Sequence, residues 1–108
     1  MSEHVLDRLA AVIAQRHGGD PQTSYTAKLF NQGPEKISKK LGEEAVEAVI
    51  EGTKGDTARL ADESADVLYH MLVLWSAHGL DPADVWAALE KRLGTSGIAE
   101  KKARGAEE

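Results

Sequence analysis

The chain contains no cysteine in its 108 residues, which excludes disulfide bonds, thiolate nucleophiles and cysteine-ligated zinc or iron–sulfur sites. It also lacks an excess of basic residues: the formal net charge is −5, whereas a nucleic-acid partner usually requires a basic surface. No apolar run approaches the ~20 residues of a membrane span; residues 71–75, for example, form a run of only five. The N-terminus is acidic and no apolar segment follows it, so no secretory signal is expected. These absences predict a soluble, cytoplasmic protein without a nucleic-acid or membrane partner.

Strand patterns, internal repeats and linker-like segments are absent too, and the apolar spacing is helical almost throughout. Glycine, proline and capping residues divide the chain into five expected helices. The first carries residues 5–13 and stops at the glycines 18–19, and the second is short and ends before Gly33. The third runs from Pro34 to about Glu51, the fourth from its cap Asp56 to residue 76 or 77, and the fifth from Pro82 onward. The sequence therefore predicts one all-α bundle domain over residues 1–104, with a frayed tail at residues 105–108.

The third and fourth expected helices carry apolar residues around most of their circumference. A helix that is apolar on every side must be buried on every side, and five helices in one small chain are too few for that. We therefore expect a homodimer that forms a larger bundle. The apolar positions concerned are Ile37, Leu41, Ala45, Val46, Ala48, Val49 and Ile50 on one helix, and Val67, Leu68 and residues 71–75 on the other.

Carboxylates are grouped on the same two helices. Glu44 and Glu47 are three residues apart, as are Glu63 and Asp66, so each pair shares one helix face. A tight connection at residues 52–55 makes the two helices antiparallel neighbours. At about 1.5 Å per residue, Glu47 and Glu63 lie roughly 8 and 10 Å from that connection, and the other two lie about one turn further away. The spacing predicts that four carboxylates meet at one level.

A divalent cation gives such a group a physical reason. Like charges at this spacing repel one another, and Glu47 and Asp66 lie within otherwise apolar stretches. Ligands that are all oxygen select Mg²⁺, or Mn²⁺ in its place, over softer metals. The alternative is an exposed acidic face neutralised by Lys39, Lys40 and Arg59. Two paired clusters in apolar surroundings favour the metal.

Signatures of other chemistries are missing. The chain contains no His-Glu-x-x-His, Gly-x-Ser-x-Gly, Walker A or Gly-x-Gly-x-x-Gly motif. A ferritin-like di-iron site needs Glu-x-x-His pairs, whereas Asp66 and His70 are four residues apart and Ile50 occupies the corresponding place on the other helix. His70 either touches the carboxylates or is a half-buried histidine with a local hydrogen bond.

The stretches around these carboxylates are similar to a known enzyme family. Glu44-x-x-Glu47, a 15-residue gap and Glu63-x-x-Asp66 resemble the metal motif of the MazG-like all-α nucleotide pyrophosphohydrolases. Residues 24–30, 33–47 and 63–74 narrow the resemblance to the phosphoribosyl-ATP pyrophosphatases, whose basic C-terminal motif is approximated by residues 96–104. The similarity extends over nearly the whole chain, from about residue 5 to residue 104.

This resemblance implies Mg²⁺-dependent hydrolysis of phosphoribosyl-ATP to phosphoribosyl-AMP and pyrophosphate, a step of histidine biosynthesis, by a homodimer. The metal ligands would be Glu44, Glu47, Glu63 and Asp66. Because a triphosphate brings about four negative charges, its cleavage is mainly a problem of positioning and charge neutralisation. Glu43 is then either a further ligand or the base that orients the attacking water.

Substrate contacts are expected upstream of the carboxylates. Lys36, Lys39 and Lys40 either pair with phosphates or make only local contacts on the helix surface. Resemblance alone suggests the further contacts Ser24, Tyr25, Thr26 and Lys28, although a helix cap explains Ser24 or Thr26 equally well. Two other functions stay open: a housecleaning nucleoside triphosphate pyrophosphatase with the same metal cluster, and a non-catalytic helical interaction module.

Overall fold

Five α-helices account for most of the chain that the structure, a computed structural model, describes, namely residues 4–94 and 105. They are α1 (Val5–Gln15), α2 (Tyr25–Gln32), α3 (Pro34–Lys54), α4 (Thr57–Ala77) and α5 (Pro82–Leu93). The prediction of an all-α fold is confirmed for these residues. The basic C-terminal motif at residues 96–104 and most of the expected frayed tail lie outside the described residues. No helix within the described part is long and apolar enough to cross a membrane.

Capping side chains start the helices where the sequence indicates. Ser24, Asp56 and Asp81 each accept a hydrogen bond from a backbone N–H in the first turn of α2, α4 and α5, at 3.1, 3.1 and 2.9 Å. Pro34 occupies the first turn of α3, where its missing N–H costs nothing. The predicted starts of these helices are therefore confirmed.

α3 is about one turn longer than predicted. The expected end was about Glu51, but the helix continues through Gly52, and Gly55 ends it in the left-handed conformation with φ +77°. The Thr53 hydroxyl donates to the backbone carbonyl four residues earlier at 2.9 Å, which supports the added turn. Gly52 was misinterpreted as a terminating signal, because a glycine ends a helix only where its backbone leaves the right-handed region.

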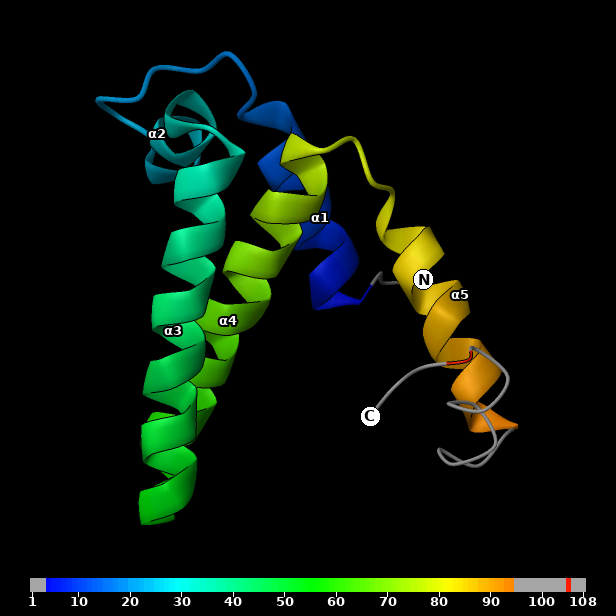
Figure 1. The fold of residues 1–108 in the computed structure, drawn as a ribbon. Helices are drawn as coiled ribbons and strands as arrows, with labels where there is room; N and C mark the ends of the chain where they lie inside the picture. Colours follow the sequence, from blue (N-terminus) through cyan, green and yellow to red (C-terminus); the bar gives the residue numbers. More distant parts are fainter. Residues whose placement is uncertain (1–3, 95–104, 106–108) are drawn as a thin grey trace.

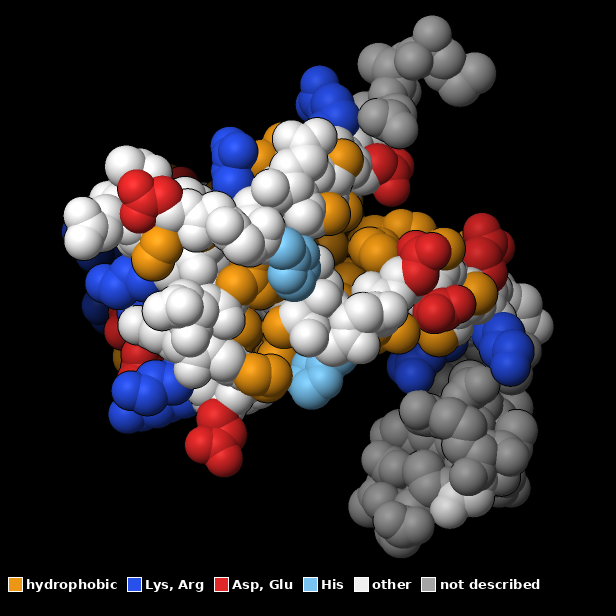
Figure 2. Space-filling view, turned by 90° about the horizontal axis from the view of Figure 1, so that it is seen from above, with side chains coloured by type: hydrophobic (Ala, Val, Ile, Leu, Met, Phe, Trp, Pro, Cys, Tyr) orange, Lys and Arg blue, Asp and Glu red, His pale blue; other side chains and the backbone are white. Residues whose placement is uncertain are grey.

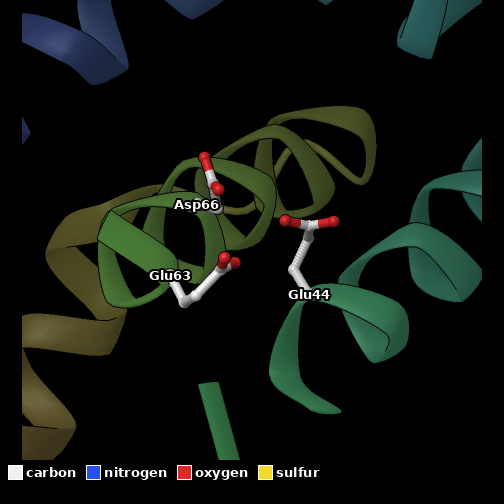
Figure 3. Close-up of side chains that lie close together, drawn as sticks. All are labelled: Glu44, Glu63 and Asp66. Carbon is white, nitrogen blue, oxygen red and sulfur yellow. The ribbon is translucent and has the colours of Figure 1, made fainter. Parts of the chain in front are cut away.

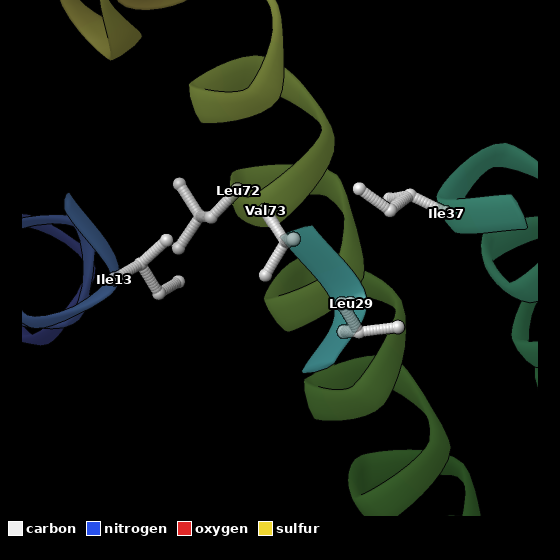
Figure 4. Packing of buried hydrophobic residues seen from close by; sticks show 5 residues of the cluster. All are labelled: Ile13, Leu29, Ile37, Leu72 and Val73. Atoms are coloured by element: carbon white, nitrogen blue, oxygen red, sulfur yellow. The ribbon is translucent and has the colours of Figure 1, made fainter. Parts of the chain in front are cut away.

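α3 and α4 form a long antiparallel pair, and α1 and α2 cover the half of it that lies away from the α3–α4 turn (Figure 1). The apolar core lies in this covered half. Its five buried side chains come from all four helices and are at most 3% exposed (Figure 4): Ile13, Leu29, Ile37, Leu72 and Val73. Burial of these side chains fixes α1 and α2 against the pair.

The half of the pair near the turn is built differently. From residue 38 to residue 69, all of them described, Glu51 is the only buried side chain. Val46, Val49 and Ile50 are 57%, 65% and 42% exposed, although their i, i+3, i+4 spacing places them on one stripe of α3. α5 has no buried residue and lies apart from the pair in Figure 1. The single chain thus leaves two apolar surfaces uncovered.

Candidate active site

Three carboxylates from α3 and α4 meet in the half of the pair near the turn. Oxygen atoms of Glu44, Glu63 and Asp66 all lie within 4.8 Å of one another. Figure 3 shows Glu44 reaching from α3 toward the two side chains of α4. The antiparallel register brings them together, since Glu63 and Asp66 share one face of α4. Donors that are all oxygen, at this separation, fit a small hard divalent cation.

The Glu63 carboxylate is affected by several neighbouring charges. Partial burial raises its pKa, and the charges of Asp66, Glu47, Glu44 and Glu51 raise it further. Glu47, the fourth predicted ligand, is exposed and lies outside the group of three, although its charge still acts on Glu63. The repulsion that the sequence indicated is therefore centred on Glu63, and a bound cation would relieve it.

A cleft of about 260 Å³ adjoins the carboxylates along α2 and α3. Five of the seven predicted substrate contacts line it, and Glu43 stands at its edge; the lining residues are Tyr25, Lys28, Leu29, Gln32, Lys36, Lys39, Lys40 and Glu43. Figure 2 shows Lys and Arg side chains gathered on the left, the side of α2 and α3. Four ammonium groups around one cleft favour a ligand with several negative charges.

Lys40 connects the cleft to the carboxylates. Its Nζ lies 3.6 Å from Oε2 of Glu44 and 3.8 Å from Oε1 of Glu43. Interaction with Tyr25, and then with the Glu44 carboxylate, raises the pKa of Lys40, so it stays protonated at neutral pH. A positive charge therefore stands beside the Glu44 carboxylate and faces the cleft.

His70 has a local structural partner and a partner in the cleft. It is buried, and its Nδ1–H donates to the backbone carbonyl of Asp66 at 2.7 Å, because a carbonyl oxygen can only accept. Nε2 therefore accepts a hydrogen bond from the Tyr25 hydroxyl at 3.1 Å. Both ring nitrogens are occupied, so the interpretation with a local hydrogen bond is confirmed. Burial raises the pKa of Tyr25, which keeps the phenol protonated as a donor.

Ser24 and Thr26 do not line the lysine-rich cleft. The Ser24 hydroxyl caps α2, and the buried Thr26 hydroxyl bonds to the hydroxyl of Tyr69. As substrate contacts they stay predictions, and each already has a structural partner.

Comparison with known proteins agrees with this geometry. The model of the phosphoribosyl-ATP pyrophosphohydrolase family matches residues 6–93. The chain belongs to this family. A relative from Azospirillum brasilense named phosphoribosyl-ATP pyrophosphatase is 62% identical over 104 residues, covering 96% of this chain and 94% of the relative. A relative of the same name from Cereibacter sphaeroides is 60% identical over 101 residues, covering 94% and 98%. The predicted resemblance is confirmed, and the chain is an enzyme rather than a non-catalytic interaction module.

Some features of this site were not predicted from the sequence. Gln32 lines the cleft, and its signal was its place one helical turn after Lys28. The bond between Tyr25 and His70 joins residues 45 apart, and no local pattern announces it. The burial of Glu51 was missed as well, although Glu51 follows Glu44 by seven residues and so shares its helix face.

Proposed function

We propose that this chain hydrolyses phosphoribosyl-ATP to phosphoribosyl-AMP and pyrophosphate in the cytoplasm, as a step of histidine biosynthesis. Mg²⁺, or Mn²⁺ in its place, would be held by Glu44, Glu63 and Asp66, with Glu47 beside them. The observation that carries the proposal is the meeting of three carboxylates at the edge of a lysine-lined cleft, in a chain of this family.

The lysines around the cleft and the bound metal have different roles in substrate binding. The ammonium groups of Lys28, Lys36, Lys39 and Lys40 bind phosphate oxygens and hold the polyphosphate against α3. A bound Mg²⁺ supplies charge neutralisation at the phosphate oxygens and lowers the pKa of a coordinated water. Lys40 lies next to both the carboxylates and the expected phosphate position, because it contacts Glu44 while lining the cleft.

Glu43 orients the attacking water. It lines the cleft, is exposed and lies outside the group of three carboxylates, which supports the role of a base over that of a metal ligand. Hydrolysis adds one water across the α–β phosphoanhydride bond: the hydroxyl stays on phosphorus, the proton passes to Glu43, and pyrophosphate leaves.

The substrate is tested by comparing kcat/KM for phosphoribosyl-ATP with that for ATP, the other common nucleoside triphosphates and damaged triphosphates. We expect phosphoribosyl-ATP to be strongly preferred, pyrophosphate rather than phosphate to be released, and EDTA to abolish turnover. Preference for common or damaged triphosphates would instead establish a housecleaning pyrophosphatase.

We also infer that the working unit is a homodimer. The exposed stripe of Val46, Val49 and Ile50 and the uncovered α5 support this, because each is an apolar surface that a second copy can bury.

A further inference from the structure

Glu51 is an unusual residue for the place where it lies. It is only 6% exposed, and it is the one buried side chain in the described stretch from residue 38 to residue 69. Its Oε1 is shielded from solvent and has no hydrogen-bond partner among the described residues. A buried carboxylate oxygen without a partner is unfavourable, so a bound cation would stabilise this side chain.

The side chain of Glu51 faces the same α3–α4 interface as the three carboxylates. Seven residues separate it from Glu44, which places the two within roughly 20° of each other on the helix and about 10 Å apart along its axis. Glu44 faces α4, where it meets Glu63 (Figure 3), so Glu51 faces α4 as well. Glu63 lies between them in the antiparallel register, and Glu51 is one of the charges that raise its pKa.

The described residues supply no cation for Glu51. Ion pairs within the described part of the chain are formed by Lys40, with Glu43 and Glu44, and by Arg59, with Asp56. Neither reaches Glu51. The described residues therefore do not neutralise the charge of Glu51.

The total charge of the carboxylates also favours bound cations. Glu44, Glu47, Glu51, Glu63 and Asp66 carry a formal charge of −5, so one divalent cation leaves −3 and a second leaves −1. A polyphosphate substrate adds further negative charge to the same place. Two divalent cations in one carboxylate cluster are a common solution for such substrates.

We propose that Glu51 is a ligand of a second divalent cation, bound with Glu47 and Glu63 on the side of the cluster nearer to the α3–α4 turn. Glu63 is then the carboxylate shared by both ions. This inference rests on the proposed metal-dependent function, and it adds a residue and a second ion to the site. Oxygen donors alone select Mg²⁺ or Mn²⁺ there too.

The test is Mn²⁺ binding to the full chain without nucleotide, followed by calorimetry and by electron paramagnetic resonance of the free ion. We expect two Mn²⁺ per chain for the wild type and one for Glu51→Gln, which keeps the size of the side chain. The matched control is Asp62→Asn, an exposed carboxylate on α4 next to Glu63 in sequence, and it should still bind two.

Thermal unfolding provides an independent measurement. In EDTA, Glu51→Gln should melt at a higher temperature than the wild type, because a buried charge has been removed. Saturating Mn²⁺ should raise the melting temperature of the wild type more than that of the variant.

The outcomes separate this inference from the proposed function. One Mn²⁺ per wild-type chain, or equal stoichiometry and affinity in Glu51→Gln, overturns the second site and leaves the first intact. No Mn²⁺ bound by the wild type overturns both.

Discussion

The two halves of the α3–α4 pair are made of the same two helices but are stabilised in different ways. Away from the turn, Ile37, Leu72 and Val73 are buried under α1 and α2. Near the turn, no apolar side chain is buried, and the seam between the helices contains carboxylates. The covered half thus holds the helices in register, while the other half uses that register to bring like charges together. A rigid apolar half can support an acidic half that would not be stable alone.

The largest expected effect is a loss of activity caused by a substitution in the acidic half of the α3–α4 pair. Glu63→Gln should lower kcat/KM for phosphoribosyl-ATP by about a thousandfold, because it removes a central charge from the metal site while keeping the side-chain size. Steady-state kinetics with saturating Mg²⁺ measures this, and Asp62→Asn should stay within about twofold of the wild type. A Glu63→Gln enzyme with more than a tenth of normal activity contradicts the assignment.

A substitution in the covered half of the pair should lower stability instead of activity. Leu72→Ala should lower the free energy of unfolding by about 3 kcal/mol, because it leaves a cavity in the core. Urea denaturation measures the loss. Under conditions where the variant is folded, its kcat should stay near that of the wild type, whereas Glu63→Gln should show the reverse pattern. Loss of kcat in the folded Leu72→Ala protein would mean that the two halves are not separable.

The uncovered stripe on α3 tests the dimer. Val49→Lys places a charge on a side chain that is 65% exposed in the single chain, so the fold should persist while a charge buried in the interface weakens association. We expect the dimer dissociation constant to rise at least about tenfold, measured by analytical ultracentrifugation. An unchanged constant would place the interface on another surface.

A substitution in the lysine-lined cleft tests whether the cleft binds the substrate's phosphates. Lys40→Met should raise KM for phosphoribosyl-ATP about tenfold, because a charge-assisted hydrogen bond to phosphate is lost. Lys54→Met, at the far end of α3, is the matched control and should leave KM unchanged. Equal effects of the two changes would indicate a general charge effect instead of a specific contact.

The smallest effect concerns pH. Because the folded pKa of Glu63 is raised above its ordinary value of 4.5, its contribution to stability is present below that value and is lost as pH rises through the raised pKa. In EDTA, wild-type stability should therefore fall relative to Glu63→Gln as the pH rises from 4.5 toward neutrality. Melting temperatures measure the difference, which partial exposure keeps small. Saturating Mg²⁺ at neutral pH should reverse it, and parallel curves without metal would contradict the raised pKa.

Much of the fold could be predicted because it depends on contacts between residues that are close in the sequence. Ser24, Asp56 and Asp81 cap helices by contacts within three residues, and the pairing of Glu63 with Asp66 follows from helical spacing alone. The end of α3 could not be predicted from Gly52, because only the backbone conformation distinguishes that glycine from Gly55.

The site was predictable in part for the same reason. Spacing placed Glu44, Glu63 and Asp66 at one level, but it could not show that Glu47 is exposed and lies outside this group while Glu51 is buried. That difference depends on the angle at which α4 crosses α3, which packing in the other half decides. The contact of Tyr25 with His70 depends on the docking of α2 in the same way.

The turn at Gly55 and Asp56 limits how this chain can change in evolution. Surface loops commonly accept insertions and deletions. Here one inserted residue, if it extended α4 at its start, would turn the helix by about 100° and carry Glu63 and Asp66 away from Glu44. A deletion would do the same in the other direction. The length of a two-residue connection is therefore as strict a requirement for catalysis as the identity of any acid, and natural variants should differ there by substitution alone.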